Sequence, residues 1–276
     1  MTRFPALVLG ASGTTGRRVA ARLAERGLAH RAASRSTVPR FDWLDRGTWD
    51  AALAGSRSVY LVPLDGEVLT RPFLKHAAAA GVRRVVLLSG RGVDVPGYTG
   101  EETDAGSTHI DGEDALRSSS LEWTLLRPSW FAQNFSEGFF ADAVRGGRMR
   151  FPAGDGAATF VDAEDIADVA VAALTEDRHL GQTYELSGPR AVSLREAADR
   201  IAEASGKPLD YTPVPVDRFL AELVESGWDA DAAHQYAAAF HPLRNDLDSH
   251  YSDGVERALG RSPRSFEQFA AGAWKR

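Results

Sequence analysis

The first half of the chain alternates short apolar runs with longer amphipathic stretches. The apolar runs have the length of buried strands in a parallel sheet, and they are Ala6–Leu9, Ala29–Ala33, Ser58–Val62, Arg84–Leu88 and Trp123–Pro128. The stretches between them have helical periodicity, and they are Gly16–Arg26, Gly47–Leu53, Glu67–Ala80 and Thr108–Ser118. Strands that alternate with helices predict an α/β fold with a doubly wound parallel sheet and right-handed crossovers.

A glycine-rich turn joins the first predicted strand to the first helix. Glycines let the backbone approach a pyrophosphate closely, and the helix N-terminus supplies N–H donors and a positive dipole. The strand before the turn and the amphipathic helix after it favour this interpretation over an ordinary tight βα turn. The turn therefore predicts a Rossmann-type dinucleotide site, with contacts from Gly10, Ser12, Gly13, Thr14, Thr15 and Gly16.

The end of the second predicted strand indicates which dinucleotide binds. An NAD site has an acidic residue there, which accepts a hydrogen bond from the ribose 2′-hydroxyl. This chain has Ser34, Arg35 and Ser36 instead, and the next carboxylate is Asp42. A guanidinium between two hydroxyls matches a phosphate dianion, so the predicted cofactor is NADP(H). The alternative is that Arg35 is a solvated loop charge.

The pattern changes after Pro128. Segment Ser129–Met149 is rich in Phe and Trp and is expected to be mostly helical. The later predicted elements are helices at Glu164–Leu174, Ser193–Ser205 and within Asp217–Phe240, and a strand at Thr183–Leu186. We expect an NADP-binding Rossmann-type domain in residues 1–150 and a smaller, mostly helical C-terminal lobe in residues 151–276. This lobe would bind substrate over the carboxyl ends of the strands and return some elements to the sheet.

The composition argues against several classes of protein. The 276 residues are 43% hydrophobic and 25% charged, which suffices for a large core. A net charge of −6 without a basic stripe argues against nucleic acid and membrane partners. The chain has no cysteine, so we expect no disulfide, no thiol nucleophile and no metal. No run approaches the about 18 apolar residues of a membrane span, and the early first strand leaves no room for a signal peptide.

A cytoplasmic location and a small-molecule partner are therefore expected, and the sequence leaves open whether the protein is a monomer or a homodimer.

Several segments resemble a known family. They are the glycine-rich turn, the second strand ending in Arg35, Ala80–Ser89, Leu121–Phe135 and Gly260–Phe266. The chain resembles the NmrA-like branch of atypical short-chain dehydrogenases over nearly its whole length. Within that branch, Phe41–Leu44 and Val59–Pro63 are similar to the agroclavine-dehydrogenase-like group. These motifs are specific for fold and cofactor and much less so for substrate.

The resemblance implies further cofactor contacts. The implied positions are Asp42 and Trp43 beside the adenine, Leu61, Val62 and Pro63 under the inner ribose and phosphates, Ser89 and Gly90 on the nicotinamide side, and Pro128, Ser129 and Trp130 at the carboxamide. Both Trp43 and Trp130 are equally compatible with positions in an aromatic core.

The catalytic pair typical of short-chain dehydrogenases is missing. Those enzymes use Tyr-x-x-x-Lys, in which the lysine lowers the pKa of the tyrosine that protonates the carbonyl oxygen. The corresponding positions here are Asp104 and Thr108, and no Tyr-x-x-x-Lys occurs in the chain. Catalytic candidates are His109 and Ser89. Because His109 and Glu113 are four residues apart, they are expected to share a helix face, as a proton relay or as a structural pair.

The missing acid constrains the reaction. Reduction of a ketone builds an alkoxide, and loss of one stabilising donor costs about 2.7–4 kcal/mol. Reduction of an iminium ion builds no anion and depends more on an aromatic pocket. The pocket candidates are Tyr98, Trp130, Phe131, Asn134, Phe135, Phe139, Phe140 and Phe160. Their helical spacing is also typical of core residues, and a mixture is expected.

The predicted function is an NADP(H)-dependent oxidoreductase that transfers hydride to an imine, iminium or conjugated carbonyl, in secondary metabolism. The alternative is a non-catalytic NADP(H)-sensing regulator of the NmrA type, and a weaker one is a non-redox enzyme such as a cyclase. A sensor would keep the dinucleotide site without an apolar pocket above the nicotinamide.

Overall fold

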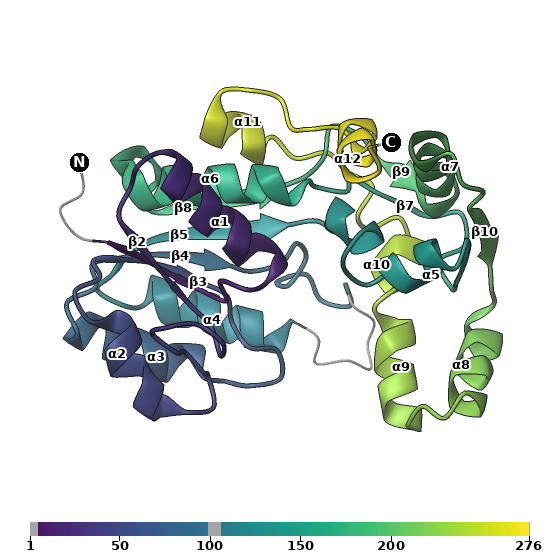
Figure 1. The fold of residues 1–276 in the computed structure, drawn as a ribbon. Coiled ribbons are helices and arrows are strands. Elements are labelled where there is room, and N and C mark those ends of the chain that lie inside the picture. Colours follow the sequence, from purple (N-terminus) through teal and green to yellow (C-terminus); the bar gives the residue numbers. More distant parts are fainter. Residues whose placement is uncertain (1–4, 99–105, 276) are drawn as a thin grey trace.

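A parallel six-stranded sheet with the order β2-β1-β3-β4-β5-β8 lies at the centre of the molecule (Figure 1). The computed structural model describes residues 5–98 and 106–275 of the chain. The strands are β1 (Ala6–Leu9), β2 (His30–Ala33), β3 (Ser58–Leu61), β4 (Arg84–Leu88), β5 (Glu122–Pro128) and β8 (Gln182–Leu186). The strand order reverses between β1 and β3, where open α/β sheets bind ligands. The predicted Rossmann-type sheet is confirmed.

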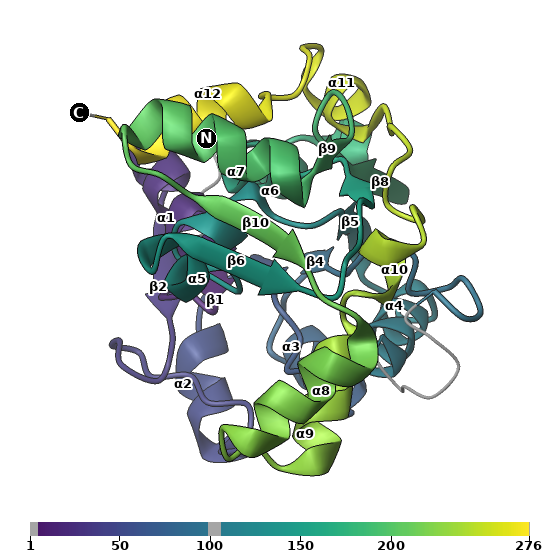
Figure 2. The ribbon, with the colours of Figure 1, turned by 90° about the vertical axis from the view of Figure 1, so that its right-hand side faces the viewer.

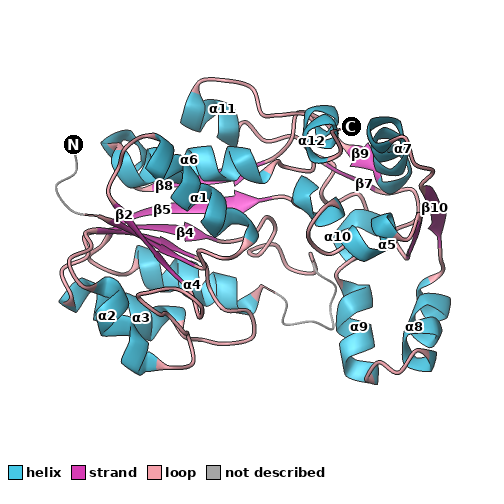
Figure 3. Cartoon of the chain, in the orientation of Figure 1, coloured by secondary structure: helices cyan, strands magenta, loops and turns pink. Residues whose placement is uncertain are grey.

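Helices cover both faces of this sheet (Figures 1 and 3). One face carries α1 (Thr14–Glu25), α6 (Ala163–Thr175) and α11 (Gly254–Leu259), and the other carries α2 (Trp49–Leu53), α3 (Thr70–Ala79) and α4 (Ser107–Arg117). Buried Val19 and Ile166 fill the first interface, and buried Phe73 and Leu116 fill the second. None of the helices in the described part of the chain has both the length and the apolar character needed to cross a membrane.

The remaining elements form a smaller lobe beside the carboxyl ends of the strands (Figure 2). Its strands are β6 (Arg148–Phe151) paired with β10 (Asp210–Pro213), and β7 (Ala157–Ala158) paired with β9 (Val192–Ser193). Its helices are α5 (Ala141–Arg145), α7 (Leu194–Ser205), α8 (Val216–Glu225), α9 (Ala230–Ala238), α10 (His241–Arg244) and α12 (Phe266–Ala273). Because α6 and β8 fall between lobe segments, the sheet part and the lobe interleave along the chain. Short 3-10 turns occupy Arg46–Thr48, Ala132–Phe135 and Asp177–His179.

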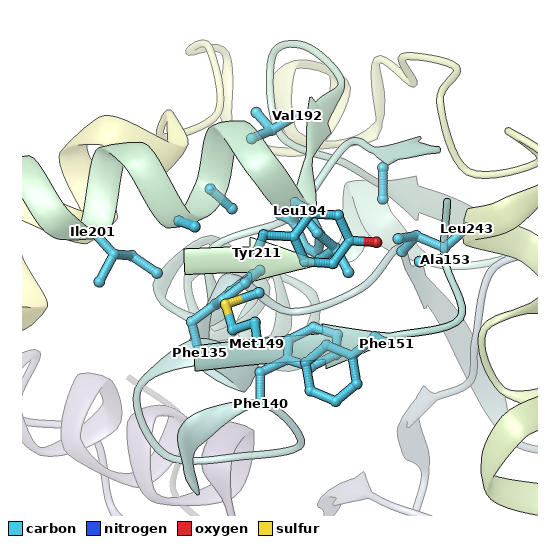
Figure 4. Close-up of a cluster of buried hydrophobic side chains, with 14 of the residues drawn as sticks. Phe135, Phe140, Met149, Phe151, Ala153, Val192, Leu194, Ile201, Tyr211 and Leu243 are labelled. Carbon is cyan, nitrogen blue, oxygen red and sulfur yellow. The ribbon is translucent and has the colours of Figure 1, made fainter. Parts of the chain in front are cut away.

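The segment after Pro128 differs from the expected helix. It contains a 3-10 turn, then α5, then β6, and the prediction of a mostly helical segment is wrong. The chain turns back so tightly at Gly138 that a Cβ there would lie 3.1 Å from the Cα of Asn134. Its aromatic rings enter the core of the lobe, where Phe135, Phe140 and Phe151 lie together (Figure 4). The conformation of this segment is therefore determined by the packing of its rings in the lobe core, and its helical spacing does not produce one long helix.

Local sequence features set several helix ends. The Ser193 hydroxyl accepts a hydrogen bond from the Glu196 amide at 3.1 Å and caps α7. Gly81 closes α3 with a φ of +91°. Gly227, with a φ of +98°, divides the predicted helical segment Asp217–Phe240 into α8 and α9.

Candidate functional site

The glycine-rich turn between β1 and α1 is tightly closed. Gly10 has a φ of +65°, and its carbonyl accepts a hydrogen bond from the Gly13 amide at 2.8 Å. A Cβ on Gly16 would lie 2.2 Å from the Gly10 oxygen, which no side chain can accept. No side chain caps the N-terminus of α1 at Gly13. The first-turn amides are thus available to an anion at the switch point of the sheet, which fits a dinucleotide pyrophosphate.

The carboxyl end of β2 carries a cluster of hydroxyls beside a free guanidinium. Ser34 is buried, and its Oγ lies 3.2 Å from that of Ser36. Thr37 joins them, because its Oγ1 accepts a hydrogen bond from the Ser34 amide at 2.6 Å. Arg35 is exposed and makes no hydrogen bond or ion pair with any described residue. The Asp42 carboxylate is held by Arg40 at 2.9 Å.

Trp43 is fixed at the end of β3. Its Nε1 donates to the Val62 carbonyl at 3.1 Å, and its ring packs edge-on against Phe41, Trp49 and Phe73. The side chain is half-buried. Its core role is therefore visible in the structure, and its contact with adenine stays a prediction.

A cleft of about 470 Å³ opens where β3, β4 and β5 end against the lobe. Its lining residues are Asp65, Gly90, Arg91, Tyr98, His109, Pro128, Ser129, Trp130, Phe131, Asn134, Ala239, Pro242 and Asp248. Eight of these were predicted from the sequence, and the structure adds Asp65, Arg91, Ala239, Pro242 and Asp248. Two other hollows, of about 590 and 600 Å³, share no lining residue with this cleft.

Two serines lie buried at the ends of β4 and β5. The Ser129 hydroxyl has no hydrogen-bond partner within residues 5–98 and 106–275. The Ser89 hydroxyl lies beside Glu113 but makes no hydrogen bond of normal geometry. Because buried hydroxyls are normally paired, these two fit a polar ligand group such as the nicotinamide carboxamide.

The expected pairing of His109 with Glu113 is not formed. Arg127 binds the buried Glu113 carboxylate with two hydrogen bonds, at 2.8 and 2.6 Å. Although burial acts in the opposite direction, the Arg127 guanidinium holds the pKa of Glu113 below its ordinary value. His109 turns instead to Asp65, with 3.1 Å between its Nε2 and the Asp65 Oδ1. A relay through Glu113 is therefore wrong, because its oxygens are already used in ion pairs.

Four predicted pocket aromatics, Phe135, Phe139, Phe140 and Phe160, do not line the cleft. Phe135 and Phe160 are 0% and 2% exposed, and their ring centroids are 5.2 Å apart. Both also pack against Phe266. They belong to the lobe core because the tight turn after Phe131 removes the expected common helix face. The indole of Trp130 does line the cleft and stacks on Phe140 with centroids 5.5 Å apart.

A buried polar network at the cleft was not predicted. The Tyr98 hydroxyl donates a hydrogen bond to Asp248, and burial together with this carboxylate raises the tyrosine pKa. Burial also raises the pKa of Asp248, against the effects of Tyr98 and Arg91. At Gly92 a Cβ would lie 2.3 Å from the Tyr98 ring, so the glycine leaves room for this tyrosine.

Arg91 holds this network to the lobe. Its side chain is 2% exposed, and its Nε lies 2.9 Å from Glu185. Its Nη1 donates to Thr159 at 2.8 Å and to the His250 carbonyl at 3.1 Å. The Arg91 charge is thus fully engaged within the protein.

Of the two positions that replace the Tyr-Lys pair, one lies among the described residues. Thr108 is buried in the first turn of α4. Asp104 lies outside the described residues.

Comparison with known proteins agrees with this geometry. A family model described as NAD(P)H-binding matches residues 10–177. The chain is 33% identical to (4-alkanoyl-5-oxo-2,5-dihydrofuran-3-yl)methyl phosphate reductase of Streptomyces griseus, over 96% of both proteins. It is 29% identical to agroclavine dehydrogenase of Claviceps fusiformis, again over 96% of both.

Among solved structures, an NADPH-dependent quinone oxidoreductase of Escherichia coli complexed with NADPH has a TM-score of 0.76. That similarity covers 97% of this chain and 99% of the other, at 22% sequence identity, and it supports the fold. The resemblance to the agroclavine-dehydrogenase-like group is confirmed by the curated relative.

Proposed function

The chain belongs to the NAD(P)H-binding, NmrA-like family of Rossmann-fold oxidoreductases, and we propose that it uses NADPH to reduce an imine, iminium or conjugated carbonyl. The observation that carries the proposal is the cleft at the ends of β3, β4 and β5, which joins the cofactor side of the sheet to an aromatic lobe surface. When bound, the reduced nicotinamide supplies a hydride. The residues of the chain bind and orient the substrate beside it.

The proposed preference for NADPH rests on the end of β2. Arg35 is unpaired among the described residues and lies next to the hydroxyls of Ser34 and Ser36. The nearest carboxylate in the sequence, Asp42, is already bound by Arg40. A 2′-phosphate would therefore meet donors there and no free carboxylate.

The state of Tyr98 supports substrates that need no tyrosine acid. Its hydroxyl proton is committed to Asp248, and its raised pKa makes it a poor proton donor. An alkoxide formed from a simple ketone would find little stabilisation from this residue. Hydride addition to an iminium builds no anion, and addition to the β-carbon of a conjugated carbonyl builds an enolate, which is less basic than an alkoxide.

The charges of the cleft restrict the substrate further. The carboxylates Asp65 and Asp248 line the cleft. Arg91 is the one Lys or Arg among the described lining residues, and it already bonds to Glu185 and Thr159 within the protein. Trp130 and Phe131 add aromatic surface. This combination suits a neutral or cationic ring system and disfavours a phosphorylated substrate such as the one named for the Streptomyces relative.

A sensor is the second candidate, and the cleft argues against it, because a regulator that only senses NADP(H) needs no aromatic cavity beside the nicotinamide site. The test is to follow the absorbance of NADPH with a panel of cyclic imines, N-alkyl iminium salts, enones and ketones. We expect oxidation with iminium salts or enones and little with simple ketones. Tight NADPH binding without oxidation by any panel member would instead identify a sensor.

A further inference from the structure

Asp65 and His109 meet at the rim of the cleft from two different elements. Asp65 lies in the loop after β3, and His109 lies in the first turn of α4. The Nε2 of His109 is 3.1 Å from the Asp65 carboxylate, and both residues line the cleft. The other ring nitrogen, Nδ1, is buried and has no partner within the described ranges. One side of the imidazole is therefore held, and the other is free to bond a ligand.

We propose that Asp65 and His109 form a proton-delivering dyad for the substrate of this cleft, and this inference rests on the proposed function. His109 is the catalytic residue, because its ring lines the substrate cleft. Asp65 is a positioning residue. The hydrogen bond from His109 lowers the pKa of Asp65, so this carboxylate is ionised near neutral pH. An ionised Asp65 accepts a hydrogen bond from Nε2–H, which leaves Nδ1, unpaired among the described residues, as the proton donor of the dyad.

No other charged group among the described neighbours competes for His109. On α4, Asp111 is bound by Arg71 of α3 at 2.8 Å, and Glu113 is bound by Arg127. Across the cleft, Tyr98 and Asp248 bond to each other, and the Arg91 charge is taken up by Glu185 and carbonyl groups. The charge that faces the imidazole is thus that of Asp65, whose side chain is 86% exposed and reaches solvent.

The proton balance differs between substrate types. Reduction of an enone adds the hydride of bound NADPH to the β-carbon, and the C=C electron pair becomes an enolate. The imidazolium gives its Nδ1 proton to the enolate α-carbon, which leaves a saturated carbonyl, NADP⁺ and a neutral imidazole. Water then restores the proton to the dyad. An N-alkyl iminium ion accepts hydride at carbon and becomes an amine, with no proton transfer at all.

This difference gives the test. Cyclohexenone and an N-methyl dihydroisoquinolinium salt are compared as substrates of the parent, His109→Gln and Asp65→Asn chains. General acid catalysis contributes about 10²–10⁴-fold, so His109→Gln should lower kcat for the enone by about 10²-fold and leave the iminium rate within about threefold. Asp65→Asn should give a smaller kcat loss on the enone with little change in KM.

A second Asp–His pair provides a matched control. His76 and Asp50 lie 2.7 Å apart on α3 and α2, and neither lines the cleft. His76→Gln and Asp50→Asn should leave both reactions unchanged. Titration of NADPH fluorescence should give the same Kd for the parent and all four variants, and similar Tm values should show that all are folded.

The dyad also has a product signature. In D₂O, the parent should place deuterium on one face of the enone α-carbon, and His109→Gln should place it on both faces. Equal losses on both substrates, or an unchanged enone rate in His109→Gln, would overturn the dyad while the reductase function stands. A parent chain that reduces neither substrate would overturn the reductase function and the dyad together.

Discussion

At the scale of single residues, the partners of a charged group decide what it can do. Arg35 and Arg91 are both arginines at the carboxyl end of the sheet. Arg35 makes no bond with the described residues, so its donors are available to a ligand. Arg91 is 2% exposed and bonds only to the protein, so it holds the fold together and offers no charge to a substrate.

Arg35→Asp should exchange the cofactor preference. The substitution removes a charge-assisted hydrogen bond to the 2′-phosphate, worth about 1.5–3 kcal/mol, and adds repulsion. We expect the Kd for NADPH to rise by about 10- to 100-fold while binding of NADH improves, as measured by fluorescence titration. Arg145→Asp, at an exposed position of α5 in the lobe, is the charge-matched control. Equal affinity of the parent chain for both cofactors would contradict this prediction.

Tyr98→Phe should affect stability more than turnover. Because its proton is committed to Asp248, its removal should change turnover by less than about tenfold, or about 1.4 kcal/mol in the barrier. A thousandfold loss of kcat would restore an ordinary carbonyl reductase with a displaced tyrosine.

The stability effect of Tyr98→Phe has a defined pH dependence. Burial raises the pKa of Asp248 in the folded chain, so its contribution to stability falls as pH rises from about 3.9 through the raised pKa. The Tyr98 hydroxyl opposes this by bonding the carboxylate. The Tm deficit of Tyr98→Phe should therefore be larger at pH 7 than at pH 4. Tyr251→Phe, at an exposed position, should show no such trend.

At the scale of elements, the βα turn shows what sequence could predict. Its features are local in sequence, because they all lie within Ala6–Glu25. They are an apolar strand, glycines where the backbone turns tightly, and a helix N-terminus without a side-chain cap. The same holds for the Ser193 cap and the Gly81 helix end. In contrast, the segment after Pro128 has apolar residues at helical spacing but folds by ring packing, which depends on distant partners such as Phe266.

The residue pairs of the site that the sequence did not predict also depend on partners that are distant along the chain. The Tyr98–Asp248 bond joins residues 150 positions apart, and Asp65 meets His109 of α4 from the loop after β3. Sequence spacing carries no information on such pairs. The helix spacing of His109 and Glu113 did suggest a pair, but Arg127 on β5 takes the carboxylate instead.

Two glycine substitutions in the turn between β1 and α1 should have separate effects, one on cofactor binding and the other on folding. Gly13 is exposed with φ −79° and ψ 175°, which valine can adopt, so Gly13→Val should keep the fold and block approach of the pyrophosphate. Gly16→Ala places a Cβ 2.2 Å from a backbone oxygen and should lower the Tm in the absence of any ligand. Thermal unfolding and NADPH titration distinguish the two outcomes. Unchanged NADPH binding by Gly13→Val would mean that the phosphates bind elsewhere.

At the scale of the whole molecule, the cleft forms between the sheet part and the lobe, and it depends on contacts that fix the position of one against the other. The sheet part supplies its floor through the ends of β4 and β5, and the lobe supplies Trp130, Ala239 and Pro242. Arg91, at the end of β4, bonds to Thr159 and to the His250 carbonyl on segments that belong with the lobe. This single guanidinium therefore links the cofactor side to the substrate side.

Arg91→Met should loosen that link. The change removes the ion pair with Glu185 and the hydrogen bonds to Thr159 and the His250 carbonyl, so we expect a loss of about 2–4 kcal/mol in the free energy of unfolding. The lobe should then hold substrate less well, and KM for the preferred substrate should rise more than the Kd for NADPH. Arg84→Met is the matched control, because Arg84 begins the same strand and pairs with the more exposed Glu122 and Asp177.

Loss of such surface pairs costs about 0–1 kcal/mol, and Arg84 lies at the opposite end of β4 from the cleft. Denaturant unfolding of both variants, together with KM and Kd, measures the comparison. If Arg91→Met were no less stable than Arg84→Met, the buried arginine would not be what joins the two parts. If stability fell while KM and Kd stayed fixed, the lobe would keep its place by apolar packing through Trp130 and Phe140, and the cleft would not depend on Arg91.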